Sequence, residues 1–183
     1  MQLHMIWSPG KGGSHLAMGV PRGYSIRTFR DSDRDGWISL MRASGFDSWG
    51  QESAKRAVSA ALPEGIYFAV HDASGELVGT AMAGHAPTEL HPFGGELGWV
   101  GVSPAHRGKR LSTLLCFEVV QRFLRAGYRE IYLQTDDWRL PAIKTYVNLG
   151  FVPLLCSSEM EERWRLAARN LGLSYEALGA IER

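Results

Sequence analysis

The stretch that decides the fold runs from 95 to 115 and reads GELGWVGVSPAHRGKRLSTLL. Residues 95–102 are mostly apolar and include Trp and Val, which favour pleated strands, and Pro104 ends this strand. Apolar residues then recur at 111, 114, 115, 119 and 123, which predicts a helix over 111–124 with one buried face. The sequence therefore predicts a strand, a turn and a helix in direct succession.

The turn between these two elements is basic, and it is the first candidate binding site. Arg107, Gly108, Lys109 and Arg110 stand immediately before the expected helix start at Leu111. The first turn of a helix leaves backbone N–H groups unpaired and carries a partial positive charge, so a pyrophosphate would bind well there. A solvated basic turn that only caps the helix fits the same residues.

Working outward, the remaining patterns alternate between strands and helices. Strands are expected at 24–29, 65–71, 77–83, 130–134 and 151–155, and helices at 37–42, 52–61, 140–149, 159–171 and 175–181. The strand, helix and strand between 95 and 134 predict a right-handed crossover. We expect an α/β fold with one domain over 23–183, preceded by a flexible leader over 1–22 that includes the Gly-rich segment SPGKGGS.

Composition excludes several classes of function. A chain of 183 residues with net charge +1 has no overall field that would attract nucleic acid or an anionic membrane. Cys116 and Cys156 form no disulfide framework, and the six histidines lack metal-ligand spacing, so no metal site is expected. No apolar run is long enough for a membrane span and no secretory signal is evident, which favours a cytoplasmic location.

The stretch from 95 to 115, taken with AIKTYVNLGF at 142–151, resembles the GNAT family of N-acyltransferases. The family's loop reads Arg/Gln-x-x-Gly-x-Gly/Ala. Arg107 matches its first position, whereas Arg110 stands where the family has Gly and Ser112 where it has Gly or Ala. Ser112 is small enough for close backbone approach, but the side chain of Arg110 must either point away from the phosphates or bind them. The resemblance is clear over 95–153 and extends to Tyr24.

The resemblance implies a GNAT-like fold: a mixed, mostly antiparallel central sheet with a splayed parallel strand pair and flanking helices. It also implies acetyl-CoA as co-substrate. The implied binding residues are Val100, Gly101, Val102, Arg107, Gly108, Lys109, Arg110, Leu111 and Ser112. Gly98 and Gly101 would let the pantetheine arm approach the strand, although glycines that only pack against a helix would look the same.

The implied reaction is attack of a primary amine on the thioester. An alkyl ammonium has a pKa of about 10.4, so only about one in 2,500 is neutral at pH 7 and a base must take up its proton. Glu96 matches the family's base position, although it would also fit as an ordinary exposed carboxylate on a strand. The other candidates for the base are Glu130, Asp136 and Asp137.

Tyr146 matches the family's tyrosine that protonates the leaving thiolate, although packing would also explain a tyrosine on this helix. The acceptor would be a small-molecule or protein amine, for which Trp49 and Trp138 are candidate lining residues, and a homodimer is possible. The main competing hypothesis is a non-catalytic acyl-CoA-binding or regulatory module, which the departure at Arg110 favours. Nucleotide binding at the same turn would need a magnesium carboxylate that the spacing does not supply.

Overall fold

The computed structural model describes residues 2–11 and 19–182 and has an α/β fold. Its contacts divide the chain into two compact units, one made of residues 1–16 with 130–183 and the other of residues 17–129. The larger unit carries the basic turn, and the smaller unit carries Tyr146. Each unit is described by itself below.

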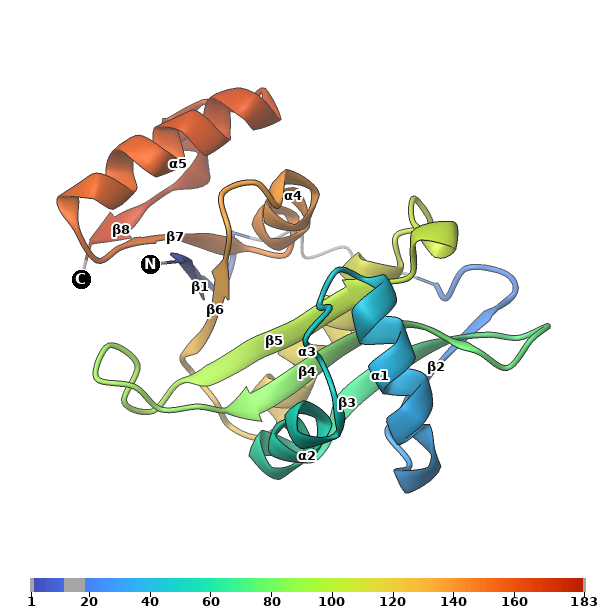
Figure 1. Cartoon of the computed structure of the whole chain (residues 1–183). Helices are drawn as coiled ribbons and strands as arrows, with labels where there is room; N and C mark the ends of the chain where they lie inside the picture. Colours follow the sequence, from blue (N-terminus) through green and yellow to red (C-terminus); the bar gives the residue numbers. More distant parts are fainter. Residues whose placement is uncertain (1, 12–18, 183) are drawn as a thin grey trace. The chain divides into compact units, whose positions relative to one another are not determined.

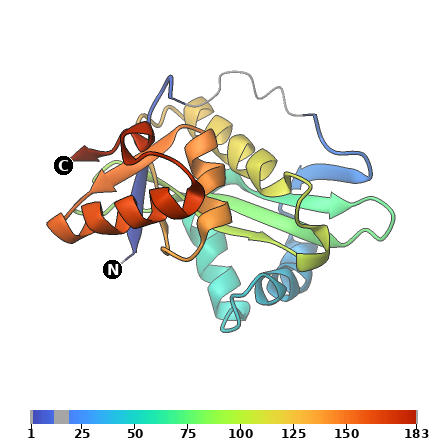
Figure 2. The same ribbon diagram turned by 90° about the horizontal axis from the view of Figure 1, so that it is seen from above.

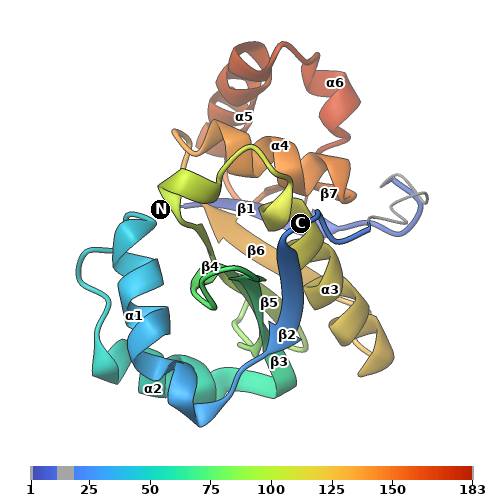
Figure 3. The ribbon, with the colours of Figure 1, turned by 90° about the vertical axis from the view of Figure 1, so that its right-hand side faces the viewer.

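The larger unit is built on four antiparallel strands in chain order, each paired with the next. They are β2 (Tyr24–Thr28), β3 (Ala61–His71), β4 (Leu77–His85) and β5 (Gly95–Val102). Helices α1 (Arg34–Ala43) and α2 (Gln51–Ala60) cover one face of this sheet. Helix α3 (Leu111–Arg125) covers the other face, as Figures 1 and 3 show. The 3₁₀ turns η1 (Asp31–Asp33) and η2 (Pro104–His106) precede α1 and α3.

Buried apolar side chains pack against both faces of this sheet. On the α1 and α2 face, Trp37, Met41, Trp49 and Phe68 form the centre of a buried cluster. On the other face, the predicted apolar stripe of α3 is confirmed. Its five members, Leu111, Leu114, Leu115, Val119 and Phe123, are all buried. The helix pattern in the sequence therefore identified the inward side of α3 correctly.

The smaller unit has its own strands, in the order β6-β1-β7-β8. Their bounds are β1 (Leu3–Trp7), β6 (Ile131–Thr135), β7 (Phe151–Leu155) and β8 (Ile181–Glu182). All pairs are antiparallel except β7 with β8. Helices α4 (Leu140–Asn148) and α5 (Ser158–Leu171) both contact β7 (Figure 2), and the short α6 (Tyr175–Leu178) follows.

The expected flexible leader is wrong for its first residues. The segment Leu3–Trp7 is strand β1, which lies between β6 and β7, with Leu3 and Met5 fully buried. Five residues with two inward apolar side chains give too weak a pattern to predict a strand, because the partners of β1 lie more than 120 positions along the chain. Residues 12–14 of the Gly-rich segment lie outside the described residues.

Two other expectations about the fold meet different outcomes. A mixed, mostly antiparallel arrangement with flanking helices is confirmed. The expected splayed parallel pair would consist of β5 and β6, one from each unit, and stays a prediction. Over residues 2–11 and 19–182, no helix combines the length and the apolar character that crossing a bilayer requires.

Candidate functional site

Strand β5 carries a β-bulge just before the basic turn. Met82 pairs with Gly98 and Thr80 with Gly101, so two residues of β5 stand opposite one residue of β4. The bulge places Trp99 in the left-handed region, with φ 51°. A bulky residue seldom adopts this conformation, which costs on the order of 1–3 kcal/mol, and such strain gathers at functional sites. Strand β5 is therefore deformed just before Val100, where the predicted binding residues begin.

The basic turn has the backbone shape that the family pattern demands. Gly108 has φ 77° and Arg110 has φ 60° with ψ 17°, so both are left-handed. This explains why Gly is expected at position 110, because a side chain there carries a steric penalty of about 1–2 kcal/mol. Arg110 adopts the left-handed conformation despite this cost, and its side chain is exposed. The substitution therefore preserves the fold of the turn.

Helix α3 begins immediately after Arg110 and presents free backbone donors. Its first helical hydrogen bond runs from the Leu114 N–H to the Arg110 carbonyl, at 3.1 Å. No side chain from the described part of the chain caps this end. The N–H groups of Leu111, Ser112 and Thr113 are the ones that a helix start leaves without an intrahelical partner. Their backbone positions suit an oxyanion ligand.

Two of the three basic side chains are anchored beside this helix start. The Arg107 Nε donates to the Val102 carbonyl oxygen at 3.3 Å, and the Lys109 Nζ donates to the Tyr24 hydroxyl at 2.6 Å. All three basic residues, Arg110 included, are exposed. Exposed cations at a helix N-terminus form an anion site whose strength falls with added salt.

Aromatic and imidazole groups cluster behind Lys109, and the sequence did not predict their contacts. The Tyr24 hydroxyl and the His106 Nδ1 are 2.9 Å apart, and the rings of His71 and His106 lie 5.1 Å apart between centroids. Burial and the nearby charge of Lys109 lower the pKa of His106. Tyr24 and His71 are direct cross-strand partners, so only the register of β2 with β3 could have revealed the cluster.

The glycines of β5 serve different purposes. A Cβ atom on Gly101 would come within 2.9 Å of the Ser44 Oγ on the α1 side, so Gly101 lets the helix end pack closely. A Cβ on Gly98 would meet nothing within 4 Å. The helix-packing interpretation therefore applies to Gly101, whereas the space beside Gly98 is open.

Glu96 points to the sheet face that α1 and α2 cover. A Cβ atom on its neighbour Gly95 would collide with the Phe123 ring of α3, and successive strand residues face opposite ways. The carboxylate is half-buried, and it has no hydrogen-bond or ion-pair partner in the described part of the chain. Burial raises the pKa of Glu96, as a general base working near neutral pH requires.

The other three candidate bases, Glu130, Asp136 and Asp137, each have interaction partners. Asp137 is held by Arg163 through two hydrogen bonds of 3.0 and 2.7 Å, and Asp136 accepts one from the Gln2 side chain at 3.1 Å. Glu130 also has an interaction partner. Of the four candidates, Glu96 alone has no hydrogen-bond or ion-pair partner within the described residues.

Tyr146 belongs to the smaller unit, near the end of α4. Its side chain is 5% exposed, and its ring lies edge-on to Phe151 at 6.1 Å between centroids. The basic turn and Glu96 therefore belong to one unit, and Tyr146 belongs to the other. Trp138, a candidate lining residue, is 72% exposed beneath the guanidinium of Arg139, whereas Trp49 is buried in the larger unit.

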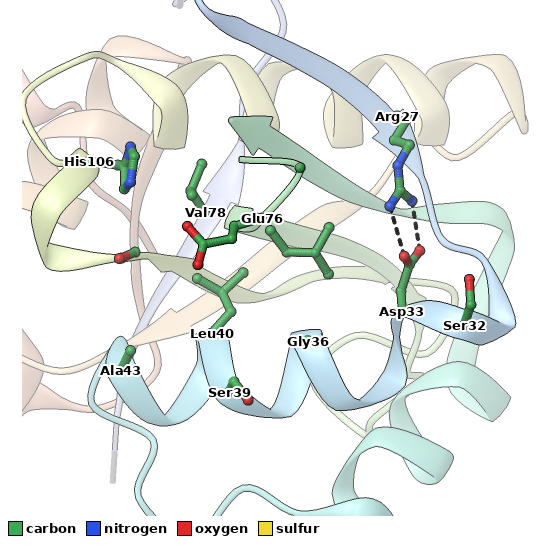
Figure 4. A pocket seen from close by; sticks show the side chains of 13 residues that line it. Arg27, Ser32, Asp33, Gly36, Ser39, Leu40, Ala43, Glu76, Val78 and His106 are labelled. Atoms are coloured by element: carbon green, nitrogen blue, oxygen red, sulfur yellow. Dashed lines mark hydrogen bonds and ion pairs between the residues drawn. The ribbon is translucent and has the colours of Figure 1, made fainter. Parts of the chain in front are cut away.

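The larger unit also has a hollow of about 450 Å³ between α1 and the β3–β4 turn. Figure 4 shows the Arg27–Asp33 pair at one end, His106 at the other and Glu76 between them. Arg27 donates two hydrogen bonds of 2.7 Å to Asp33, which lowers the pKa of that carboxyl. No metal-binding group of three or more His, Cys, Asp or Glu residues occurs among the described residues.

Comparison with solved structures supports the same fold. A tandem GNAT protein from the clavulanic acid biosynthesis pathway superimposes with a TM-score of 0.62 at 24% identity, covering 84% of this chain and 50% of that one. A GNAT family acetyltransferase from Brucella melitensis, in complex with acetyl-CoA, gives 0.51 at 21% identity, covering 62% and 76%. At these identities the likeness concerns the fold.

Comparison with curated sequences finds acetyltransferases. A mycothiol acetyltransferase from Gordonia bronchialis is 33% identical over 135 residues, which are 69% of this chain and 42% of that protein. An uncharacterized N-acetyltransferase from Schizosaccharomyces pombe is 34% identical over 49% of this chain and 53% of its own length. The chain thus spans about half the length of these relatives.

The model of the acetyltransferase (GNAT) family matches residues 33–151, which is more than half of the chain. The matched region contains the bulged strand β5, the basic turn, the start of α3 and the Tyr146 helix. The chain therefore belongs to the acetyltransferase (GNAT) family.

Proposed function

We propose that this protein is an N-acetyltransferase that moves the acetyl group of acetyl-CoA to a primary amine by direct attack on the thioester. The observation that carries the proposal is the start of α3. Left-handed Gly108 and Arg110 lead into unpaired first-turn N–H groups, beside anchored cations. Family members use acetyl-CoA as co-substrate, and this turn has the shape and charge to hold its pyrophosphate.

The binding roles follow from the chemistry of each group. The N–H groups of Leu111 and Ser112 would donate to pyrophosphate oxygens, and Lys109 and Arg110 would add charge. The pantetheine amides would pair with backbone groups of Val100 and Val102 on the bulged strand. Arg110 fits this role despite the steric cost of its left-handed backbone. Its side chain is exposed at the turn, so it would reach the pyrophosphate without disturbing the backbone N–H groups.

The reactive roles fall to Glu96 and Tyr146. The ammonium of the acceptor passes a proton to Glu96, directly or through water, and the neutral amine then attacks the thioester carbonyl. The carbon–sulfur bond breaks, the amine nitrogen loses its second proton to solvent, and the departing thiolate takes a proton from the Tyr146 hydroxyl. A carboxylate with a raised pKa accepts a proton more readily near pH 7 than an ordinary one does, and a phenol stays protonated there.

The test measures thiol release from acetyl-CoA over a panel of primary amines and peptides. Wild-type protein should release thiol, whereas Glu96→Gln and Tyr146→Phe should each lower kcat by about 10²-fold or more. Matched controls are Glu118→Gln, a half-buried carboxylate on α3, and Tyr132→Phe, a buried tyrosine on β6. Calorimetry with acetyl-CoA on the same proteins reports binding separately.

The competing hypothesis, a non-catalytic acyl-CoA-binding module, predicts a different result. Wild-type protein would then bind acetyl-CoA and release thiol no faster than either variant with any acceptor. No heat of binding at low salt, with either free or acetylated coenzyme, would overturn both hypotheses.

A further inference from the structure

Three aromatic side chains form a partly exposed cluster at the bulge of β5 in the larger unit. The ring of Trp99 meets that of Trp49 at 4.2 Å between centroids, with planes at 69°, and that of Phe46 at 5.9 Å. Trp49 is 2% exposed and is anchored in the core, whereas Trp99 is 39% exposed. Phe46, Trp49 and Trp99 are called the aromatic wall below.

The wall is assembled from two segments that are distant in the chain. Phe46 and Trp49 lie in the loop between α1 and α2, which crosses the face of β5 in Figure 1. Trp99 comes from the bulge of β5. Edge-to-face contacts of this kind contribute about 0.5–1.5 kcal/mol beyond buried area, so they hold the Trp99 ring in a defined position.

The conformation of Trp99 is costly and needs a reason. Its φ of 51° is a left-handed value that a bulky residue rarely adopts. Packing alone does not require a tryptophan there, because more than a third of the side chain remains open to solvent. An exposed aromatic ring held on strained backbone is the pattern expected of a ligand-binding position.

Glu96 and the wall share one face of the sheet. Glu96 points away from α3, and Trp99 contacts the loop between α1 and α2, so both lie on the side that these helices cover. Three strand residues span about 10 Å. The Glu96 carboxylate, which has no partner among residues 2–11 and 19–182, thus stands about that far along the strand from an exposed ring.

We propose that the aromatic wall binds the apolar end of the amine acceptor, and that the preferred acceptors are primary amines with an aryl group a few carbons from the nitrogen. The ring of such an acceptor would pack on Trp99 while its ammonium reaches Glu96. This inference rests on the proposed acetyltransferase function, since it concerns the acceptor of that reaction. All the residues that select the acceptor in this inference belong to the larger unit.

The test compares phenethylamine with propylamine as acceptors, by kcat/KM for thiol release. Wild-type protein should prefer phenethylamine by about tenfold, which corresponds to roughly 1.4 kcal/mol. In Trp99→Gly the preference should fall close to one, and Trp99→Phe should retain most of it. Glycine at 99 adopts φ 51° without strain, so this variant removes the ring while keeping the bulge.

The control is Leu124→Ala, which removes a side chain of similar exposure (38%) from α3 on the opposite face of the sheet. It should leave the preference unchanged. Equal rates for the two amines in wild type, or an unchanged preference in Trp99→Gly, would overturn the inference while the transferase function stands. Absence of thiol release with any amine would instead overturn the proposed function, and the inference with it.

Discussion

The Lys109 Nζ lies 2.6 Å from the Tyr24 hydroxyl oxygen, which ties a cation of the basic turn to strand β2. The ammonium also sits 5.2 Å from the centroid of the Tyr24 ring. Tyr24 completes the arrangement through His106, whose Nδ1 is 2.9 Å from the same hydroxyl. Tyr24 is therefore a positioning residue for Lys109, 85 positions away in the sequence.

Removing this hydroxyl should weaken cofactor binding without slowing the chemical step. Tyr24→Phe keeps the ring and frees the Lys109 ammonium, so we expect KM for acetyl-CoA to rise about three- to tenfold and kcat to change less than about twofold. The control is Tyr128→Phe, which breaks another tyrosine–histidine contact, with His85 at 2.8 Å. Equal KM values for the two variants would contradict a positioning role for Tyr24.

The same cluster should make stability depend on pH. The pKa of His106 is lowered, chiefly by burial and then by the charges of Lys109 and His71, while Glu76 opposes the shift. Between the two pKa values of His106, the unfolded chain therefore binds a proton that the folded chain does not. The contribution of His106 to the free energy of unfolding is present above about pH 6.5 and is lost as pH falls through its lowered pKa in the folded chain.

Urea unfolding at about pH 7.5 and about pH 5 measures this contribution. The free energy of unfolding should fall more for wild type than for His106→Gln, which cannot take up the proton. His85→Gln serves as the control and should behave like wild type. Parallel pH dependences for wild type and His106→Gln would show that this imidazole does not couple to folding.

The difference between expected and observed structure follows the range of the interactions involved. The stripe of α3 depends on local periodicity and the bounds of β5 on local composition, and both were predicted closely. Strand β1 depends on partners far along the chain, and the contact of Tyr24 with His106 depends on where β2 pairs with β3. Neither leaves a local pattern in the sequence. The left-handed backbone at Arg110 was hidden because its residue type argues against it.

Two substitutions at Arg110 distinguish the effect of its backbone strain from the effect of its charge. Arg110→Gly removes the left-handed penalty and should raise the free energy of unfolding by about 1 kcal/mol, measured by urea denaturation. Arg110→Ala loses the same charge but keeps the strain, so it should not be stabilised. Both variants should bind acetyl-CoA more weakly at low salt if the guanidinium contacts the phosphates. Equal stability of the two variants would show that φ 60° carries no penalty here.

The last prediction concerns the two glycines of β5. Gly101→Ala would press its new methyl group against the Oγ and Cβ atoms of Ser44, at 2.9 and 3.0 Å, and should lower the free energy of unfolding by about 1–3 kcal/mol. Gly98→Ala meets open space and should change it by less than about 0.5 kcal/mol.

The double variant Gly101→Ala with Ser44→Gly removes the atoms that collide, so it should recover most of the lost stability relative to Ser44→Gly alone. This recovery separates helix packing from cofactor approach as the reason for glycine at 101. A Gly101→Ala protein with wild-type stability and weakened acetyl-CoA binding would place the methyl group against the cofactor instead, because a collision with α1 cannot spare folding while harming binding.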